Sequence, residues 1–294
     1  MEIQNFRRRG AAARTGRAPL LRLAVVAALA AVLALISACS SASGSKPAAT
    51  PAPATSASSS GAPVDGTEIS QLPAVPSPAA TPAAPDLSTA AGQATFLRQV
   101  FADIQSVWSK DFAASGLSYT PARLVLFQSK VATACGTENA EVGPFYCPGD
   151  RAVYLDLQFF QSLTRQFGVS GDFAEAYVVA HEVGHHIQNL LGITGRVSAA
   201  GRPGNAVSVK TELQADCFAG VWAHSTYERK LLEPGDIEEA LKAAQVVGDD
   251  YLARASNTAV DPDSWTHGSS AQRQQWFTTG YQDGRADACD TFSG

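Results

Sequence analysis

Two histidines four residues apart, with a glutamate directly after the first, are the residues in this chain best suited to chemistry. They form the pattern His-Glu-x-x-His, with His181, Glu182 and His185 in the printed sequence. In an α-helix, such a pair of histidines lies on one face, about 6 Å apart along the axis, so both rings can bind one metal ion. Glu182 lies about 100° around the helix from His181, where its carboxylate can reach a water molecule on the metal. The arrangement is typical of a zinc hydrolase, and two ordinary hydrogen-bonded histidines are the alternative.

The residues around this pattern independently predict a helix from Asp172 to about Gly192. Asp172 and Glu175 match the spacing of a capping box at the start of a helix. Gly192 is a natural C-terminal stop. Gly184 lowers helix stability by about 1 kcal/mol relative to alanine, which suggests that some other group needs the backbone close there. Apolar residues recur at helical spacing between the two ends: Phe173, Tyr177, Val178, Ile187 and Leu191.

A third metal ligand is expected downstream, because a catalytic zinc ion usually takes three protein ligands and keeps one position for water. The best candidate is Glu212, in the segment Glu-Leu-Gln-Ala-Asp that ends at Asp216. A second helix over about 208–230 would place both carboxylates on one face. We therefore predict that Glu212 binds zinc and that Asp216 accepts a proton from a ligand histidine, fixing its tautomer. A solvated acidic face is the alternative.

The other histidines are predicted to have different roles. His186 and His224 lie off the predicted metal-binding faces and are interpreted as structural. His267 stands at a boundary between a loop and a helix, where it could approach the site and stabilise a developing oxyanion. A loop histidine without such a role is the alternative.

The first 38 residues have the pattern of a signal peptide. Residues 1–22 contain six arginines, 23–36 form an apolar run, and Ser37-Ala38-Cys39 follow. The ending resembles a bacterial lipobox, in which Cys39 becomes the lipidated first residue that holds the protein on a membrane. An uncleaved signal anchor is the alternative, and both interpretations place the remainder outside the cytoplasm.

Composition divides the rest of the chain into a tether and one folded domain. Residues 39–85 are mainly Ala, Pro, Ser, Thr and Gly, which bury too little apolar surface to fold, so we expect a disordered tether. Residues 86–294 are numerous enough for one domain with a core. Residues 1–38 carry six arginines and one glutamate, so the formal charge of -5 for the whole chain leaves about -10 for the remainder. An acidic domain without a basic patch argues against a nucleic-acid partner.

The apolar patterns favour an α+β fold that is mostly helical with a small sheet. They predict helices over 88–109 and 157–167 and short strands over 123–128 and 152–156. Because zinc proteases often pair an edge strand with an extended substrate, the run from Val153 to Asp156 is the candidate for that strand. An ordinary core strand is the alternative.

Five cysteines fit an exported protein, with one lipidated and four left for two disulfides. Those four allow three connectivities. Cys135 and Cys147 could close a small ring, and Cys217 with Cys289 would then hold the C-terminal tail against the second helix. A cysteine-ligated metal is the rival interpretation, but the chain contains no Cys-x-x-Cys spacing.

Four segments together resemble the bacterial putative neutral zinc metallopeptidase family: HEVGHHIQNLLG, ELQADCFAGVWA, GDIEEAL and THGSSAQRQQWF. The similarity covers most of the chain after about residue 95. The order of the motifs is also similar to membrane zinc proteases that process prenylated proteins, although Gly268 replaces their usual proline and this chain lacks their multiple membrane spans. The resemblance implies a zincin-like fold, zinc bound by His181, His185 and Glu212, Glu182 as general base, and His267 as a contact to the transition state.

These observations predict a lipid-anchored zinc-dependent endopeptidase that hydrolyses polypeptides outside the cytoplasm of a bacterial cell. Zinc would lower the pKa of its water toward about 7, and Glu182 would accept the proton as the water attacks the peptide carbonyl. Two alternatives remain open. One is an envelope lipoprotein without activity, braced by zinc, and the other is a hydrolase of non-peptide amides such as cell-wall cross-links. The sequence makes no prediction about oligomeric state.

Overall fold

The computed structural model describes residues 85–139, 143–199 and 204–293. The predicted signal peptide, the lipidated Cys39 and nearly all of the predicted tether lie outside these residues. Within the described ranges, no helix combines the length and the apolarity that a membrane span requires. The fold is α+β and mostly helical with a small sheet, as the sequence predicts.

The first described helix is α2, Ala90–Ala114. The sequence predicted a helix over 88–109, and both ends are shifted. The helix starts later because the Thr89 side chain accepts a hydrogen bond from the Gly92 amide and caps it. It ends later because Phe112 continues the buried stripe one turn beyond Trp108.

The fold contains a three-stranded sheet with the strand order β1-β5-β4. Its strands are β1 (Arg123–Phe127), β4 (Phe145–Cys147) and β5 (Ala152–Asp156). β5 pairs in parallel with β1 and antiparallel with β4. A separate hairpin joins β2 (Lys130–Thr133) to β3 (Gly136–Asn139).

The prediction that the run from Val153 to Asp156 is an edge strand is wrong. This run lies in β5, the central strand of its sheet, and all five residues of β5 are buried. Both of its edges are hydrogen-bonded to neighbouring strands, so it cannot pair with an extended substrate. Its continuous apolar run is what a strand covered on both faces requires, so β5 is a core strand.

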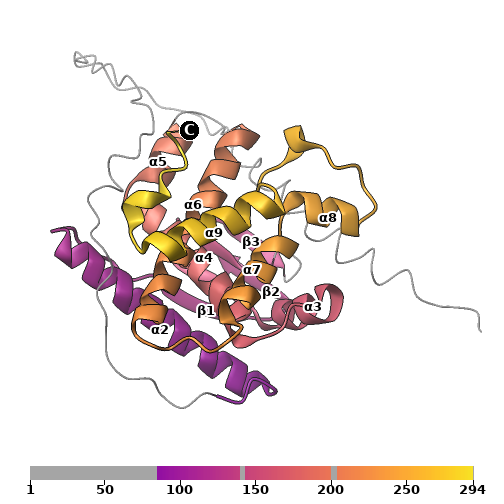
Figure 1. The fold of residues 1–294 in the computed structure, drawn as a ribbon, viewed down its shortest axis with the longest axis horizontal. Coiled ribbons are helices and arrows are strands. Elements are labelled where there is room, and N and C mark those ends of the chain that lie inside the picture. Colours follow the sequence, from indigo (N-terminus) through magenta and orange to yellow (C-terminus); the bar gives the residue numbers. More distant parts are fainter. Residues whose placement is uncertain (1–84, 140–142, 200–203, 294) are drawn as a thin grey trace, which may run out of the picture.

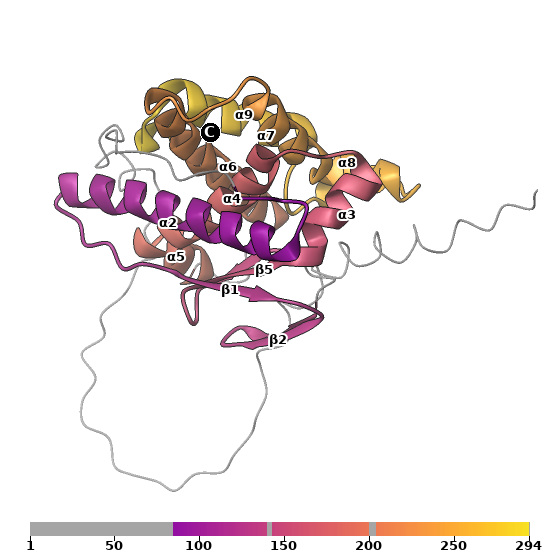
Figure 2. The ribbon, with the colours of Figure 1, turned by 90° about the horizontal axis from the view of Figure 1, so that it is seen from below.

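The remaining elements are helical and lie mainly on one side of the sheet (Figures 1 and 2). Figure 2 shows α2 running along this assembly, with β1 and β5 at the opposite side from α7 and α9. The predicted helix over 157–167 forms with those bounds. The helical elements after β5 are α3 (Leu157–Phe167), α4 (Asp172–Leu190), α5 (Ile193–Ala199), α6 (Asn205–Glu228), α7 (Asp236–Val246), α8 (Asp249–Ala255), η4 (Pro262–Ser264), α9 (Ser270–Asp283) and η5 (Ala286–Cys289).

Helix α4 carries the His-Glu-x-x-His pattern and runs through the centre of the fold. Its start differs from the prediction, because Gly171 is the N-cap and no side chain caps the helix. Asp172 is therefore the first helical residue, and Glu175 accepts a hydrogen bond from Gln93 of α2 instead of completing a capping box. The stop is as predicted, since Gly192 adopts a left-handed φ of 75° directly after the C-cap.

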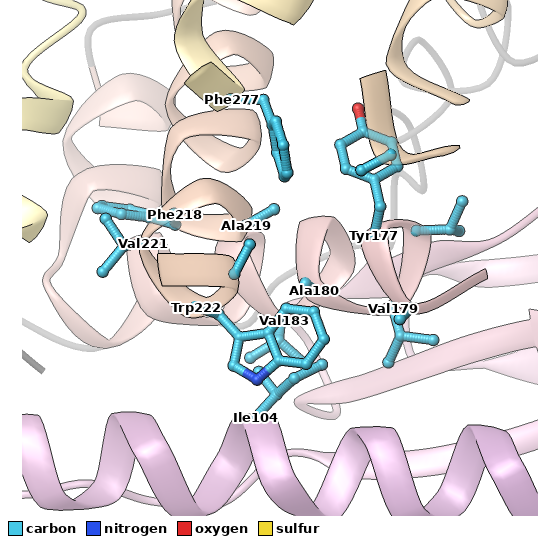
Figure 3. Close-up of a cluster of buried hydrophobic side chains, with 14 of the residues drawn as sticks. Ile104, Tyr177, Val179, Ala180, Val183, Phe218, Ala219, Val221, Trp222 and Phe277 are labelled. Atoms are coloured by element: carbon cyan, nitrogen blue, oxygen red, sulfur yellow. The ribbon is translucent and has the colours of Figure 1, made fainter. Parts of the chain in front are cut away.

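The core forms where α4 contacts α6, with α2 below and α9 above (Figure 3). Every apolar position predicted for α4 is buried, and so is Phe218 of α6. Trp108 of α2 packs edge-on against Phe218, and Phe173 stacks on Trp222. This packing fixes α4 and α6 side by side, which places their polar faces on a common site.

Three helix contacts are so close that only glycine fits. A Cβ atom on Gly184 of α4 would lie 2.9 Å from the carbonyl oxygen of Ala215 in α6, which explains the predicted close approach. A Cβ on Gly220 of α6 would lie 2.1 Å from the Phe277 carbonyl oxygen, and one on Gly280 of α9 would lie 2.0 Å from that of Cys217. These glycines let α6 contact α4 on one side and α9 on the other at backbone distance.

Both disulfides favoured by the spacing are present. Cys135 bonds to Cys147 and ties the hairpin to β4, with a Cα–Cα distance of 5.9 Å. Cys217 bonds to Cys289 and ties η5 to α6, with a Cα–Cα distance of 5.5 Å. The rival interpretation of a cysteine-ligated metal is therefore wrong, because all four of these sulfur atoms are in disulfides.

Candidate metal centre

The structure brings together the three residues predicted to bind zinc. His181 and His185 lie one turn apart on α4, and Glu212 faces them from the first half of α6. The Glu212 carboxylate spans the two rings, with Oε2 3.2 Å from His181 Nε2 and Oε1 3.4 Å from His185 Nε2. Each residue offers one ligand atom within 4.8 Å of the others.

The other nitrogen of each ring faces a hydrogen-bond acceptor. His181 Nδ1 lies 2.8 Å from Asp216 Oδ1, and His185 Nδ1 lies 2.9 Å from the side-chain oxygen of Gln188. A neutral imidazole that donates from Nδ1 carries a lone pair on Nε2. With both rings neutral, two lone pairs point at the Glu212 carboxylate, and a shared cation satisfies all three acceptors.

This donor set fits zinc. Two imidazole nitrogens and one carboxylate are a common ligand set of catalytic zinc, and the histidines already have the outer partners that such ligands use. His185, Glu212 and His181 itself all face solvent only in part, with Glu212 exposing 20% of its side chain. The site is thus largely enclosed but not completely shielded from solvent.

Asp216 lies beside His181, one of the candidate ligands, and it has two further partners. The Tyr177 hydroxyl donates to Asp216 Oδ1 at 2.6 Å, and Arg273 of α9 donates to both carboxylate oxygens at 2.9 Å. Burial alone would raise the pKa of Asp216, but the Arg273 and His181 charges hold it below its usual range. Asp216 therefore stays ionised and keeps the His181 ring oriented.

The carboxylates around His181 favour a positive charge on its ring. Burial lowers the pKa of His181, but the Asp216 and Glu212 carboxylates outweigh it and raise the pKa to about 10. The same carboxylates would stabilise a metal cation in place of the proton.

Glu182 is 7% exposed and lies on the turn that joins the two histidines. Among the described residues, its carboxylate has no hydrogen-bond partner. Burial raises the pKa of Glu182, while the nearby histidines oppose that rise. A carboxyl group with a raised pKa beside a metal site can both accept and return a proton.

His267 lies within electrostatic reach of the site, since its charge acts on Glu212. Its loop is held by Asp249, whose Oδ2 accepts hydrogen bonds from the amides of Thr266, His267 and Gly268. Asp249 Oδ1 lies 3.2 Å from His267 Nδ1. Burial lowers the pKa of His267, but Asp249 and Glu212 outweigh it and raise the pKa, which favours the ring with both nitrogens protonated.

The other two histidines make hydrogen-bond contacts away from the three candidate ligands. His186 Nε2 contacts the Thr120 carbonyl at 2.7 Å, and its Nδ1 contacts the Tyr146 hydroxyl at 3.0 Å. His224 Nδ1 contacts the Tyr281 carbonyl at 2.7 Å. Neither ring has a nitrogen directed at the three candidate ligands.

Sequence reasoning missed four supporting residues of this site: Tyr177, Gln188, Asp249 and Arg273. Gln188 follows His185 by three positions on the same helix, a spacing at which side chains meet, so it could have been found. Arg273 is 3% exposed, and although it lies in one of the segments that resemble the family, no role was predicted for it. Asp249 accepts a hydrogen bond from His267, eighteen positions further along the chain, and no periodicity in the sequence relates the two residues.

Comparison with known proteins identifies the family of the chain. A family model described as "Putative neutral zinc metallopeptidase" matches residues 63–292. The uncharacterized protein YpfJ of Escherichia coli is 46% identical over 204 residues, which cover 68% of this chain and 71% of that protein. The uncharacterized protein Mb2605 of Mycobacterium bovis is 52% identical over 186 residues, which cover 60% of this chain and 64% of that protein. No solved structure matches the chain. The chain belongs to the putative neutral zinc metallopeptidase family.

Proposed function

We propose that this protein is a zinc-dependent endopeptidase that cleaves polypeptides outside the cytoplasm, held on a membrane through a lipidated Cys39. The observation that carries the proposal is the set of acceptor atoms facing one another: the Nε2 atoms of His181 and His185 against the Glu212 carboxylate. A buried carboxyl group, Glu182, lies next to that set. Three ligands and a neighbouring base are what metal-assisted hydrolysis requires.

His181, His185 and Glu212 would hold the zinc ion. When bound, zinc supplies Lewis acidity, which lowers the pKa of water and polarises a carbonyl group. Glu182 accepts the proton that water loses on attacking the scissile carbonyl and returns it to the nitrogen of the leaving amine. The raised pKa of Glu182 suits both steps. His267, with a second proton on its ring, donates a hydrogen bond to the oxyanion that develops.

The ligand number supports an enzyme over a purely structural site. Structural zinc sites usually have four protein ligands, whereas catalytic sites have three. In the described part of the chain, the cluster that could hold a metal here consists of three residues. The site also contains a base, which a structural site does not need.

The test compares wild type with Glu182→Gln. The amide keeps the shape of the side chain but cannot accept the proton, so cleavage of an unfolded protein substrate should fall by at least about 10³-fold. Zinc content, measured by atomic emission on both proteins, should be equal. Cleavage by both proteins at similar rates would refute the role of Glu182, and zinc in neither would refute the metal site.

A further inference from the structure

A side chain that the proposed reaction does not use contacts the His185 ring at Nδ1, the nitrogen that faces away from Glu212. Gln188 lies one turn further along α4 and is fully buried. Its side-chain oxygen lies 2.9 Å from His185 Nδ1, while His185 Nε2 lies 3.4 Å from Glu212. Gln188 therefore contacts His185 in the same way that Asp216 contacts His181, with an oxygen facing the Nδ1 atom of the ring.

The orientation of the Gln188 amide is fixed by its other contacts. Its nitrogen donates to the Thr211 carbonyl at 2.7 Å and to the side-chain oxygen of Gln214 at 3.1 Å. A carbonyl oxygen only accepts hydrogen bonds, so rotating the amide by 180° would place two oxygens in contact. The Gln188 oxygen must then face His185, so the ring donates from Nδ1, and the neutral ring keeps its lone pair on Nε2.

Gln214 links Gln188 to the C-terminal tail through hydrogen bonds at both ends of its amide. Its nitrogen donates to the Cys289 carbonyl at 3.0 Å, and Gln214 is itself fully buried. Cys289 is bonded to Cys217, which lies one turn beyond Gln214 on α6. Thr291 adds a second attachment by donating to the Lys210 carbonyl at 2.6 Å. A continuous line of hydrogen bonds thus runs from the disulfide to a candidate zinc ligand.

We propose that Gln188 is a positioning residue that sets the tautomer and the direction of the His185 ring, and that Gln214 and the Cys217–Cys289 disulfide hold Gln188 in place. The inference rests on the proposed function in one respect, which is that His185 binds zinc. It adds that the disulfide near the end of the chain supports the metal site as well as the fold.

The first experiment measures zinc affinity in the full chain by competition with a chromogenic chelator. Gln188→Met keeps the length of the side chain but removes the acceptor, so we expect zinc to bind about 10-fold more weakly or worse. The visible spectrum of the cobalt-loaded protein should also change, because the ligand geometry changes.

Gln105→Met is the matched control. Gln105 is also buried, and it makes hydrogen bonds at both ends of its amide, to the Ala122 carbonyl and from the Tyr119 hydroxyl. It contacts none of the candidate ligands, so its loss should lower stability and leave zinc affinity and the cobalt spectrum unchanged. Equal losses of affinity in both variants would overturn the proposal.

The second experiment separates the two disulfides. Replacing Cys217 and Cys289 with serine should weaken zinc binding, whereas replacing Cys135 and Cys147 should not, because that pair does not contact Gln188 or Gln214. Gln214→Met tests the same connection with both disulfides intact and should also weaken binding. Wild-type affinity in Gln214→Met and in the folded Cys217/Cys289 variant would overturn the role of the disulfide.

A third measurement needs no substitution. The nitrogen chemical shifts of the His185 ring in isotope-labelled wild type should show a protonated Nδ1, and a proton on Nε2 in the zinc-loaded protein would refute the proposal. Wild type that binds no zinc would instead refute the proposed function. Wild type that binds zinc with no effect of Gln188→Met would refute only the positioning role.

Discussion

At the residue scale, the site depends on buried charges that compensate one another. Asp216 is fully buried, yet it stays ionised because Arg273 donates two hydrogen bonds to it and Tyr177 donates a third. Removing one partner of a buried pair leaves the other charge uncompensated, which typically costs about 3–5 kcal/mol. The Asp216–Arg273 pair therefore joins the proposed metal site to α9 and makes the site sensitive to changes outside its ligands.

The Asp249 side chain holds the loop that carries His267. Asp249→Ala removes the acceptor for three loop amides and for His267 Nδ1, so His267 should lose its fixed position. We expect the turnover number for a protein substrate to fall by up to about 10²-fold, as when an oxyanion donor is lost. Steady-state kinetics and zinc content on the same samples would check this.

Asp261→Ala is the control for that substitution. Asp261 accepts a hydrogen bond from the Asp263 amide in the exposed loop before η4, and Asp249, not Asp261, is the carboxylate that holds His267. Its loss should leave turnover unchanged. If Asp249→Ala lowers zinc content as much as turnover, Asp249 supports the metal site and not His267.

At the element scale, the spacing of α4, α6 and α9 is set by small residues. Gly220 and Gly280 bring α6 and α9 together at backbone distance, and this places Arg273 beside Asp216. Gly184 does the same between α4 and α6, and so places Glu212 beside the two histidines.

Gly220→Ala should therefore separate α6 from α9. The added methyl group would lie 2.1 Å from the Phe277 carbonyl oxygen, and neither backbone can move without disturbing the core. We expect a loss of about 3 kcal/mol in the free energy of unfolding, together with a lower affinity for zinc as Arg273 moves. Chemical denaturation with the disulfides intact would measure the first quantity.

Gly195→Ala is the matched control, because a Cβ there would meet nothing within 4 Å. Gly195 lies in α5, where alanine is the better helix former, so stability should stay the same or rise by up to about 1 kcal/mol. Equal stability of Gly220→Ala and wild type would contradict the close contact.

The same elements show what the sequence could and could not predict. Apolar patterns identified α2, α3, α4, β1 and β5, and the spacing of Glu212 and Asp216 identified α6. Periodicity could not show that β5 is central, since strand order depends on contacts between distant segments. The cluster of candidate metal ligands was predictable because two of them lie one helix turn apart and the third belongs to a recognisable segment. Arg273 and Asp249 were not, because their partners lie far away in the sequence.

At the scale of the whole molecule, one buried and one partly buried carboxyl group make stability depend on pH. Asp111 is fully buried, and neither of its carboxylate oxygens has a hydrogen-bond partner. Burial raises the pKa of Asp111 from 3.8 to about 7. Burial also raises the pKa of Glu175 from 4.5 to about 7, against the hydrogen bond from Gln93. Both groups lie in helices that pack into the core.

The direction of the effect follows from proton binding. Between about pH 4 and pH 7 the folded protein binds protons at these carboxyl groups that the unfolded chain has lost, so the free energy of unfolding falls as pH rises. Asp111→Asn stays neutral at every pH and should reduce this fall by up to about 4 kcal/mol. Urea unfolding from pH 4.5 to pH 8 would measure it, and parallel curves for wild type and variant would contradict the assignment.

The bond between Cys217 and Cys289 has a consequence for how the protein responds to being cut. Residues 257–264 are exposed and lie between the two cysteines in the sequence. A peptide bond hydrolysed there, by this protein or by another protease, leaves two fragments that remain covalently joined. Electrophoresis without reductant should show one band of unchanged mass, and reductant should release a C-terminal fragment that carries His267 and Arg273. A preparation that looks intact can thus contain nicked molecules, and only the comparison of the two gels would distinguish them.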